Sequence, residues 1–217
     1  MLERRGRQPE PGRIGAGSDH CVFCSRHDQP QVLFETESLY AMPDKYPMLP
    51  GHTLIIARQH LACYASASDA LLAELDMAIS RVRSFLDAAY DSPVLIFENG
   101  VAGQTVFHAH LHLVPVRILE ISATLAAHED IASSTGWKDV RAHYVLHGTY
   151  RYVQLRDRRY IIAGYSPVLH TMRRVMAETT GLSWSEHGWA RATTPEDVRN
   201  LNRRWHEWIA RDDANAW

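Results

Sequence analysis

Three histidines alternate with apolar residues in the stretch GQTVFHAHLHLVP, which covers residues 103–115. Side chains of a β-strand point alternately to opposite faces, so His108, His110 and His112 are expected to share one face. The other face is apolar and suited to a core: Phe107, Ala109, Leu111 and Leu113. Neutral imidazole is available near pH 7 for metal binding, proton transfer or attack on phosphorus. This pattern therefore predicts a strand over 105–116 that carries chemistry on one side and packs on the other.

The segments around this strand predict a sheet with one long helix. Residues 66–90 repeat apolar side chains at helical spacing, and Ser66 with Asp69 could form a capping box at the start. Short β-branched or apolar runs predict four further strands, over 31–36, 38–43, 52–57 and 93–98. Five strands, mostly antiparallel in chain order, and one helix indicate the α+β class.

From residue 116 onward the pattern changes, and a second region is expected. We predict a short helix within 119–132, a hairpin over 149–165, helices over 168–181 and 195–212, and no clear assignment for 137–147. Arg173 and Arg174 lie on the first of the two later helices. We interpret them as a solvated face, the alternative being that one reaches the distal phosphates of a ligand.

Composition narrows the class of protein. The chain has 217 residues, of which 46% are hydrophobic and 22% charged, with a formal net charge of −2. That balance is typical of a globular protein and supplies no basic field to hold nucleic acid. No segment approaches the roughly 20 apolar residues of a membrane span. Residues 1–19 are polar and rich in Gly and Pro without an apolar h-region, which predicts a flexible lead and a cytoplasmic protein.

The loop before the histidine strand favours an anion. Gly100 and Gly103 allow backbone N–H groups to approach a phosphate closely, and Asn99, Gln104 and Thr105 add neutral donors. Alone, this segment would be a simple turn. Joined directly to the histidine strand, it predicts an oxyanion cradle.

The cysteines suggest a metal or a redox pair. Cys21 and Cys24 have the spacing of half a tetrahedral zinc site, and a redox CxxC has the same spacing. Cys63 stands alone, and we expect it to be packed. His52 begins its strand, and we interpret it as a buried, hydrogen-bonded loop residue.

The segment HAHLHLV resembles the signature of the histidine triad (HIT) superfamily of nucleotide hydrolases and transferases. The upstream segment PDKYPMLPGHTLIIARQH is also similar to that family. The resemblance covers 20–116 and implies a HIT-like nucleotide-binding and catalytic domain with a five-stranded sheet and one long helix. Residues 117–217 match nothing in the compact family and are expected to be a C-terminal α/β extension.

The resemblance also implies catalytic roles. His110 would attack the α-phosphorus of a nucleotide and form a nucleotidyl-histidine intermediate. His112 would contact the phosphate and help to protonate the leaving group. Gln104 and Thr105 would hold the phosphate and leaving-group oxygens, and Gly103 belongs to the same nucleotide-binding loop.

Further roles are implied for the ribose and the metal. Asn99 would brace the loop and the phosphate. Asp44 would accept the ribose hydroxyls, although on residue type alone it is equally a turn residue beside Pro43. A structural Zn²⁺ would be held by the family-matched set Cys21, Cys24, His60 and His108.

The function implied is cleavage at an α-phosphate, by a homodimer. Dinucleoside polyphosphates, nucleoside phosphoramidates and nucleotide sugars are all compatible substrates, and the acceptor could be water, phosphate or another group. The alternative is a non-catalytic nucleotide sensor of the same fold, which would have no need of a nucleophile.

Overall fold

The computed structural model describes residues 21–25, 32–101, 103–117, 122–126, 131–162, 171–180 and 194–214. The lead predicted over 1–19 lies outside these ranges. The strands are β1 (Phe34–Glu35), β2 (Leu39–Pro43), β3 (Thr53–Ala57), β4 (Val94–Glu98), β5 (His110–Pro115), β6 (Ile131–Ser133), β7 (Arg151–Leu155) and β8 (Arg158–Ile162). The helices are α1 (Asp69–Tyr90), α2 (Ser122–Ala126), α3 (Trp137–His147), α4 (Thr171–Thr180) and α5 (Pro195–Ala214), with a 3₁₀ turn at Tyr64–Ser66. No helix in these ranges is both long and apolar enough to cross a membrane.

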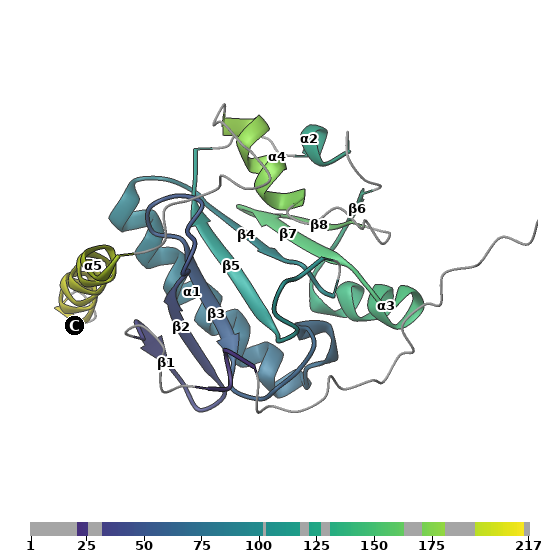
Figure 1. Ribbon diagram of the computed structural model, residues 1–217, viewed down its shortest axis with the longest axis horizontal. Helices are drawn as coiled ribbons and strands as arrows, with labels where there is room; N and C mark the ends of the chain where they lie inside the picture. The colour runs from purple at the N-terminus through teal and green to yellow at the C-terminus, as the bar shows by residue number, and fades with distance from the viewer. Residues whose placement is uncertain are drawn as a thin grey trace, which may run out of the picture.

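The described strands form one antiparallel sheet in the order β1-β2-β3-β5-β4-β7-β8-β6 (Figure 1). β5 therefore lies in the interior of the sheet, between β3 and β4. In this register Ile55 of β3 is opposite Leu111, and Phe97 of β4 is opposite His112. The predicted α+β class is confirmed.

The sequence analysis predicted five strands, and this number is wrong, because the sheet has eight among the described residues. The predicted hairpin forms as β7 and β8, and β7 pairs with the outer edge of β4. An exposed edge offers unpaired backbone N–H and C=O groups, and β7 satisfies them. The sheet is thus continuous across the boundary near residue 117, which stays a prediction.

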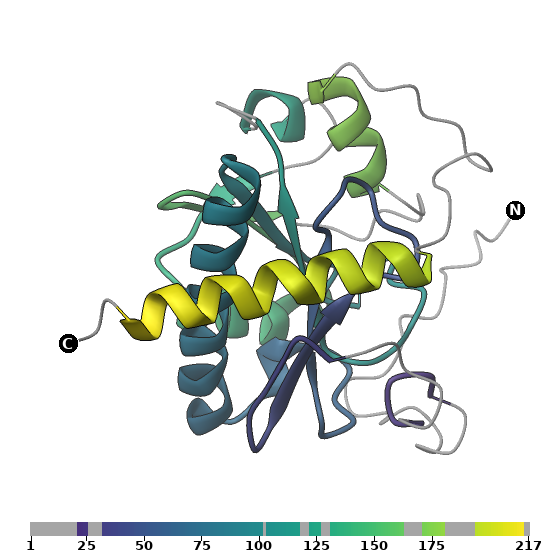
Figure 2. The ribbon, with the colours of Figure 1, turned by 90° about the vertical axis from the view of Figure 1, so that its left-hand side faces the viewer.

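Helix α1 covers one face of the sheet (Figure 2). Leu75, Val82 and Phe85 of α1 are buried together with Ile55 and Leu111 of the sheet. Helix α5 lies across α1 in the same view and seals the edge of this core with Trp205, whose ring centroid is 5.0 Å from that of Phe85. This face is the hydrophobic side predicted for the histidine strand.

The start of α1 differs from the predicted capping box. Ser68 is the N-cap, and its side chain accepts a hydrogen bond from the Leu71 N–H at 3.2 Å. Ser66 instead belongs to the preceding 3₁₀ turn and donates its hydroxyl hydrogen to the Cys63 carbonyl at 2.7 Å. Serine at either position satisfies a local backbone group, and the 3₁₀ turn decides which one caps the helix.

A buried carboxyl at the end of β4 joins the core to the C-terminal region. Glu98 is fully buried and accepts hydrogen bonds from the Tyr64 N–H, at 2.8 Å, and from the Tyr150 hydroxyl. The Tyr150 hydroxyl also accepts from the Ala65 N–H at 3.1 Å. The Tyr150 N–H donates to the Gly100 carbonyl at 3.0 Å, and a Cβ at Gly100 would lie 2.6 Å from the tyrosine ring. Tyr150 therefore fixes the point where the chain leaves β4.

We predict that Glu98→Gln flattens part of the pH dependence of stability. Burial raises the pKa of Glu98 from its ordinary value of 4.5 to about 7, so the folded state binds this proton more tightly than the unfolded state. The stabilisation is complete below pH 4.5 and is lost as the pH rises through about 7, by at most about 1.4 kcal/mol per pH unit. Glutamine stays neutral throughout, so the variant should gain stability relative to the wild type across this window.

Urea unfolding at a series of pH values measures this difference. Glu37→Gln, at an exposed position, is the matched control and should track the wild type. A stability difference between Glu98→Gln and the wild type that stays constant from pH 4.5 to 7 would contradict the prediction.

Candidate functional site

The histidines gather on the sheet face opposite α1. Because Leu111 packs toward α1, its neighbours His110 and His112 point to the other face, where their ring centroids are 5.0 Å apart. His108 precedes the strand and is fully buried on the same side, where the ring of Phe23 contacts both His108 and His110. His108, His110 and His112 therefore lie on one side of the sheet, as predicted.

The predicted strand begins too early, and Phe107 is the consequence. β5 begins at His110, and Phe107 is 58% exposed instead of packed in the core. Strand alternation carries side chains to a defined face only while the backbone stays paired. Ala109 is nevertheless buried in the core cluster with Leu111, and its backbone N–H donates to the Leu61 carbonyl at 2.6 Å.

A backbone carbonyl determines the tautomer of His110. Its Nδ1 lies 2.6 Å from the carbonyl oxygen of His108, which can only accept a hydrogen bond. Nδ1 of His110 therefore carries the hydrogen, and Nε2 keeps a lone pair. Burial lowers the pKa of His110, so that this lone pair is available at neutral pH.

His112 has the opposite tautomer, determined by a chain of two hydrogen bonds. The Met48 N–H donates to His52 Nδ1 at 3.1 Å, so the hydrogen of the His52 ring is on Nε2. This Nε2 lies 2.9 Å from Nδ1 of His112 and donates to it. His112 consequently carries its hydrogen on Nε2, and burial lowers the pKa of both rings well below the usual value.

Phe97 holds the His112 ring in place. The two rings are stacked, with centroids 4.3 Å apart and an interplanar angle of 7°. Phe97 is opposite His112 in the β4–β5 register, so the sheet itself places the aromatic ring there. The orientation of His112 is thereby set by packing on one side and by His52 on another.

Asp44 lies beside this imidazole pair. One carboxylate oxygen accepts the Tyr46 N–H at 2.6 Å, and the other is 3.6 Å from both His52 Nε2 and His112 Nδ1. The first contact is the turn geometry expected of a residue after Pro43. The three side chains are close enough to hold an ion, but the hydrogen bond between the rings already uses the ligand atom of each histidine.

The glycine loop is strained and anchored. Val101 has φ of +72°, a rare value for a β-branched residue, and Gly103 has φ of +78°. Val101 forms a bridge with Tyr150, so the C-terminal region holds this conformation in place. The buried Gln104 donates its amide hydrogen to the Ala62 carbonyl at 3.0 Å.

The other loop residues lie nearer to solvent. Thr105 is exposed and Asn99 is half-buried. The structure brings the loop to the start of the histidine segment, as the sequence requires. The phosphate contacts expected of Asn99, Gly103, Gln104 and Thr105 stay predictions.

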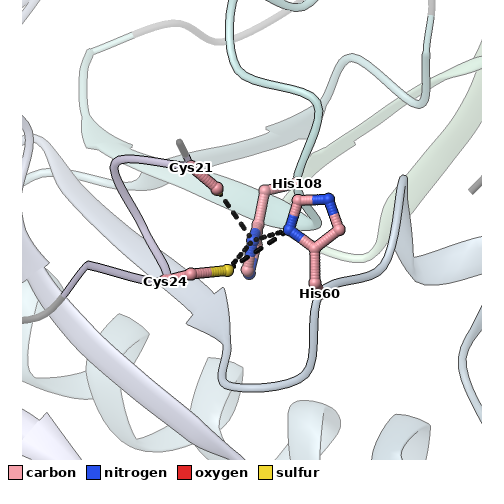
Figure 3. Close-up of side chains that lie close together, drawn as sticks. All are labelled: Cys21, Cys24, His60 and His108. Carbon is pink, nitrogen blue, oxygen red and sulfur yellow. Dashed lines mark hydrogen bonds between the residues drawn. The ribbon is translucent and has the colours of Figure 1, made fainter. Parts of the chain in front are cut away.

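The two cysteines and two histidines predicted as metal ligands converge (Figure 3). Their ligand atoms all lie within 4.8 Å of one another: Cys21, Cys24, His60 and His108. Cys21 Sγ is 3.3 Å and Cys24 Sγ 3.6 Å from His108 Nδ1, and the Nδ1 atoms of His60 and His108 are 3.2 Å apart. A tetrahedral zinc site places sulfur and nitrogen about 3.6 Å apart and two nitrogens about 3.4 Å apart. The donor set and its spacing therefore fit zinc.

The surroundings of the cluster favour a metal over a redox pair. His108 Nε2 lies 2.6 Å from the Ala57 carbonyl, which directs its Nδ1 lone pair at the thiols. Burial and the neighbouring Cys21 raise the pKa of the Cys24 thiol to about 11. The two imidazoles beside the thiols complete a set of four metal ligands, which a redox CxxC does not require, and a bound cation would itself remove the thiol protons.

Two residues of this site carried no clear functional signal in the sequence. His52 was expected to be buried and hydrogen-bonded, which the structure confirms, but its partner His112 is 60 positions away. Phe23 is known from the sequence only as a spacer in the CxxC, and in the structure it lies against His110, with centroids 5.2 Å apart. The one feature of the sequence that distinguishes Phe23 is its aromatic ring within the CxxC spacer.

Comparisons with known proteins identify the central region. A family model described as the HIT domain matches residues 26–118. An uncharacterized 16.1 kDa HIT-like protein of Mycoplasma pneumoniae is 33% identical over 107 residues, which cover 45% of this chain and 72% of that protein. Adenylylsulfatase HINT3 of Arabidopsis thaliana is 31% identical over 101 residues, which cover 44% of this chain and 51% of that protein.

One solved structure also resembles the whole fold. It is a hypothetical histidine triad nucleotide-binding protein from Sulfolobus tokodaii strain7, with a TM-score of 0.51 over 88% of this chain and 93% of that chain. At 20% identity, the likeness concerns the fold alone.

We predict that the purified protein contains about one zinc ion per chain, and that Cys24→Ala loses it. Removing one thiolate from a closed four-ligand site breaks the tetrahedron and should lower both metal content and thermal stability. Metal analysis and thermal unfolding, with and without a chelator, measure the two effects.

Cys63→Ala is the matched control, because Cys63 is buried outside the cluster and should leave the metal content unchanged. Full metal content in Cys24→Ala, or none in the wild type, would show that the cluster does not hold zinc.

Proposed function

This chain belongs to the HIT domain family, and from that premise we propose that it is a nucleotide hydrolase or nucleotidyltransferase acting at an α-phosphate through His110. The observation that carries the proposal is the pair of opposite tautomers on one strand face. His110 presents a lone pair at Nε2, and His112 presents an N–H at its own Nε2. A nucleophile and a hydrogen-bond donor side by side suit displacement at phosphorus.

The first step forms a nucleotidyl-histidine. The His110 Nε2 lone pair bonds to the α-phosphorus, and the bond from phosphorus to the leaving group breaks. The ring then carries positive charge, which the hydrogen bond from its Nδ1 to the His108 carbonyl stabilises. Water, phosphate or another acceptor next attacks the same phosphorus, and the P–N bond breaks with its electron pair returning to His110 Nε2, which restores the neutral ring. When the acceptor is water, the proton that it loses passes to the solvent.

His112 assists the leaving group. Its Nε2–H donates a hydrogen bond to the departing atom, which is sufficient for a stable anion. A more basic leaving group needs a full proton, so the His52–His112 pair must first take one up. The Asp44 carboxylate, 3.6 Å from both rings, stabilises that additional charge.

The loop and Asp44 complete the proposed nucleotide site. We assign the α-phosphate oxygens to Asn99, Gly103, Gln104 and Thr105, because this loop is anchored immediately before the histidine segment. We propose that the Asp44 carboxylate accepts hydrogen bonds from the ribose hydroxyls. The same carboxylate would stabilise positive charge on the imidazole pair. A nucleotide sensor would need neither the lone pair of His110 nor the directed N–H of His112, which favours catalysis.

Zinc bound by the Cys/His cluster would be structural, tying the CxxC segment to the residue two positions before His110. Phe23 between the two cysteines would then be held against the His110 ring. The homodimer stays a proposal, and because β7 pairs with the outer edge of β4, that edge is not its interface.

The similarity to an adenylylsulfatase favours one class of leaving group, an anion joined to the α-phosphate through an anhydride. Adenylylsulfate joins an α-phosphate to an anionic group through an anhydride, as a dinucleoside polyphosphate does. We therefore propose such anhydrides ahead of phosphoramidates and nucleotide sugars. Mass spectrometry of the products of a substrate panel, with and without inorganic phosphate, separates hydrolysis from phosphorolysis and transfer.

We predict that His110→Asn folds and binds nucleotide but turns over at least about a thousandfold more slowly, the scale for loss of a core catalytic group. Rapid-quench trapping of an acid-labile nucleotidyl adduct tests the assignment directly. His147→Asn, on the exposed end of α3, is the control and should form the adduct normally. An adduct of equal yield in His110→Asn would refute His110 as the nucleophile.

We predict that the cost of His112→Asn depends on the leaving group. Sulfate departs readily as an anion, so loss of the donor should cost little with adenylylsulfate. An amine leaving group needs a proton, and the cost should rise by about 10- to 100-fold with a phosphoramidate. Steady-state kinetics on both substrates measure the ratio, and an equal loss on both would mean that His112 does not assist departure.

A further inference from the structure

Helix α4, from the C-terminal extension, is seated on the imidazole side of the sheet. Figure 2 shows it on the opposite side of the sheet from α1. Met172, Val175 and Met176 of α4 are buried in one cluster with Met48 and Phe97. Met48 positions His52, and Phe97 stacks on His112. The extension thus packs directly on the residues that hold the imidazole pair.

Arg173 extends from this helix toward the pair. Its Nη2 donates to the Tyr46 carbonyl at 2.8 Å, and the Tyr46 N–H donates to Asp44. The second oxygen of Asp44 is 3.6 Å from His52 and His112. The half-buried guanidinium of Arg173 is therefore linked, through the backbone of Tyr46, to the carboxylate that lies beside the imidazole pair. We interpreted Arg173 from the sequence as part of a solvated helix face, and this is wrong, because its side chain is half-buried.

The charge of Arg173 acts on the imidazoles. Burial is the largest cause of the lowered pKa of both His52 and His112. The positive charge of Arg173 lowers both values further, as does the neighbouring His110. Burial also lowers the pKa of Arg173 itself, which the Asp44 carboxylate opposes. A guanidinium stays protonated under such shifts, so it remains a fixed cation beside neutral rings.

This cation has a chemical consequence for the substrate. Among the described residues discussed above, the site combines three neutral imidazoles with the Asp44 carboxylate, so Arg173 is the group among them that adds a positive charge for an anionic leaving group. An arginine side chain is long, and its planar fork matches sulfate and phosphate oxygens. A neutral amine leaving group would gain nothing from it.

We propose that Arg173 of the extension binds the leaving group and selects nucleotides in which that group is a sulfate or a phosphate chain. The inference rests on the proposed function and names its substrate class. It makes the extension a specificity element of the active site.

The test compares two substrates that share the adenosine 5′-phosphoryl group. Adenosine 5′-phosphosulfate has an anionic leaving group, and adenosine 5′-phosphoramidate has a neutral one. Arg173→Gln should lower kcat/KM by about 10- to 100-fold on the phosphosulfate, the range for loss of a hydrogen bond between charged groups. It should change kcat/KM by less than about threefold on the phosphoramidate, on the same scale.

Two further variants separate charge from structure. Arg173→Lys keeps the charge and should recover part of the phosphosulfate activity. Arg117→Gln removes the same charge at an exposed arginine paired with Asp91, and should leave both substrates unaffected. Equal losses on both substrates in Arg173→Gln would show that Arg173 only supports the Tyr46 turn, and no loss on either would show that it does not face the substrate; each result overturns the proposal.

Binding to the His110→Asn protein tests the same point without turnover. Isothermal titration of both nucleotides into this variant, with and without Arg173→Gln, should show at least a tenfold weaker affinity for the phosphosulfate alone, again on the scale of one charged hydrogen bond. If the wild type cleaves neither substrate, the proposed catalysis fails, while the binding difference still decides the role of Arg173. An unchanged affinity for both nucleotides overturns it.

Discussion

Pairing of β5 on both edges is the constraint on which the site depends. Because β3 and β4 hold the strand by backbone hydrogen bonds, Leu111 and Leu113 cannot leave the α1 side without disrupting two ladders. His110 and His112 are therefore held on the other side, where Phe97 from the neighbouring strand stacks on His112. A shift of one residue in register would bury imidazoles against α1 and expose leucines, which makes the arrangement strongly specified.

Backbone groups then assign the protons. The carbonyls of His108 and Ala57 and the N–H of Met48 each contact one ring nitrogen, and none of these groups can titrate. His108 and His112 carry their hydrogen on Nε2, whereas His110 carries it on Nδ1. His108 therefore directs a lone pair at the thiols, His110 keeps a lone pair on Nε2, and His112 presents a hydrogen there. Chemically identical side chains are distinguished by the backbone atoms that they meet.

The C-terminal region takes part in the site at two points. Tyr150 immediately precedes β7 and anchors the strained loop through Gly100 and Val101, next to the buried Glu98. α4 packs on Met48 and brings Arg173 toward Asp44. β7 extends the same sheet from β4, and α4 packs on the face that carries His110 and His112. The position of the C-terminal region and the arrangement of the histidine face are consequently linked.

The sequence by itself determined the two faces of the histidine strand, the long helix, the hairpin and the CxxC pair. These depend on periodicity and short spacing, which are local properties: Leu111 follows His110 whatever the rest of the chain does. His60 and His108 were implied as ligands only by the resemblance to the HIT family, because they lie 36 and 84 positions from Cys24. Tertiary structure decided which edge β7 would join, why Phe107 is exposed, that His52 donates to His112, and that Arg173 lies beside Asp44. Each of these depends on segments that are distant along the chain. Their pairing is selected by the burial and hydrogen bonding of the whole sheet, which residue spacing in the sequence does not reveal.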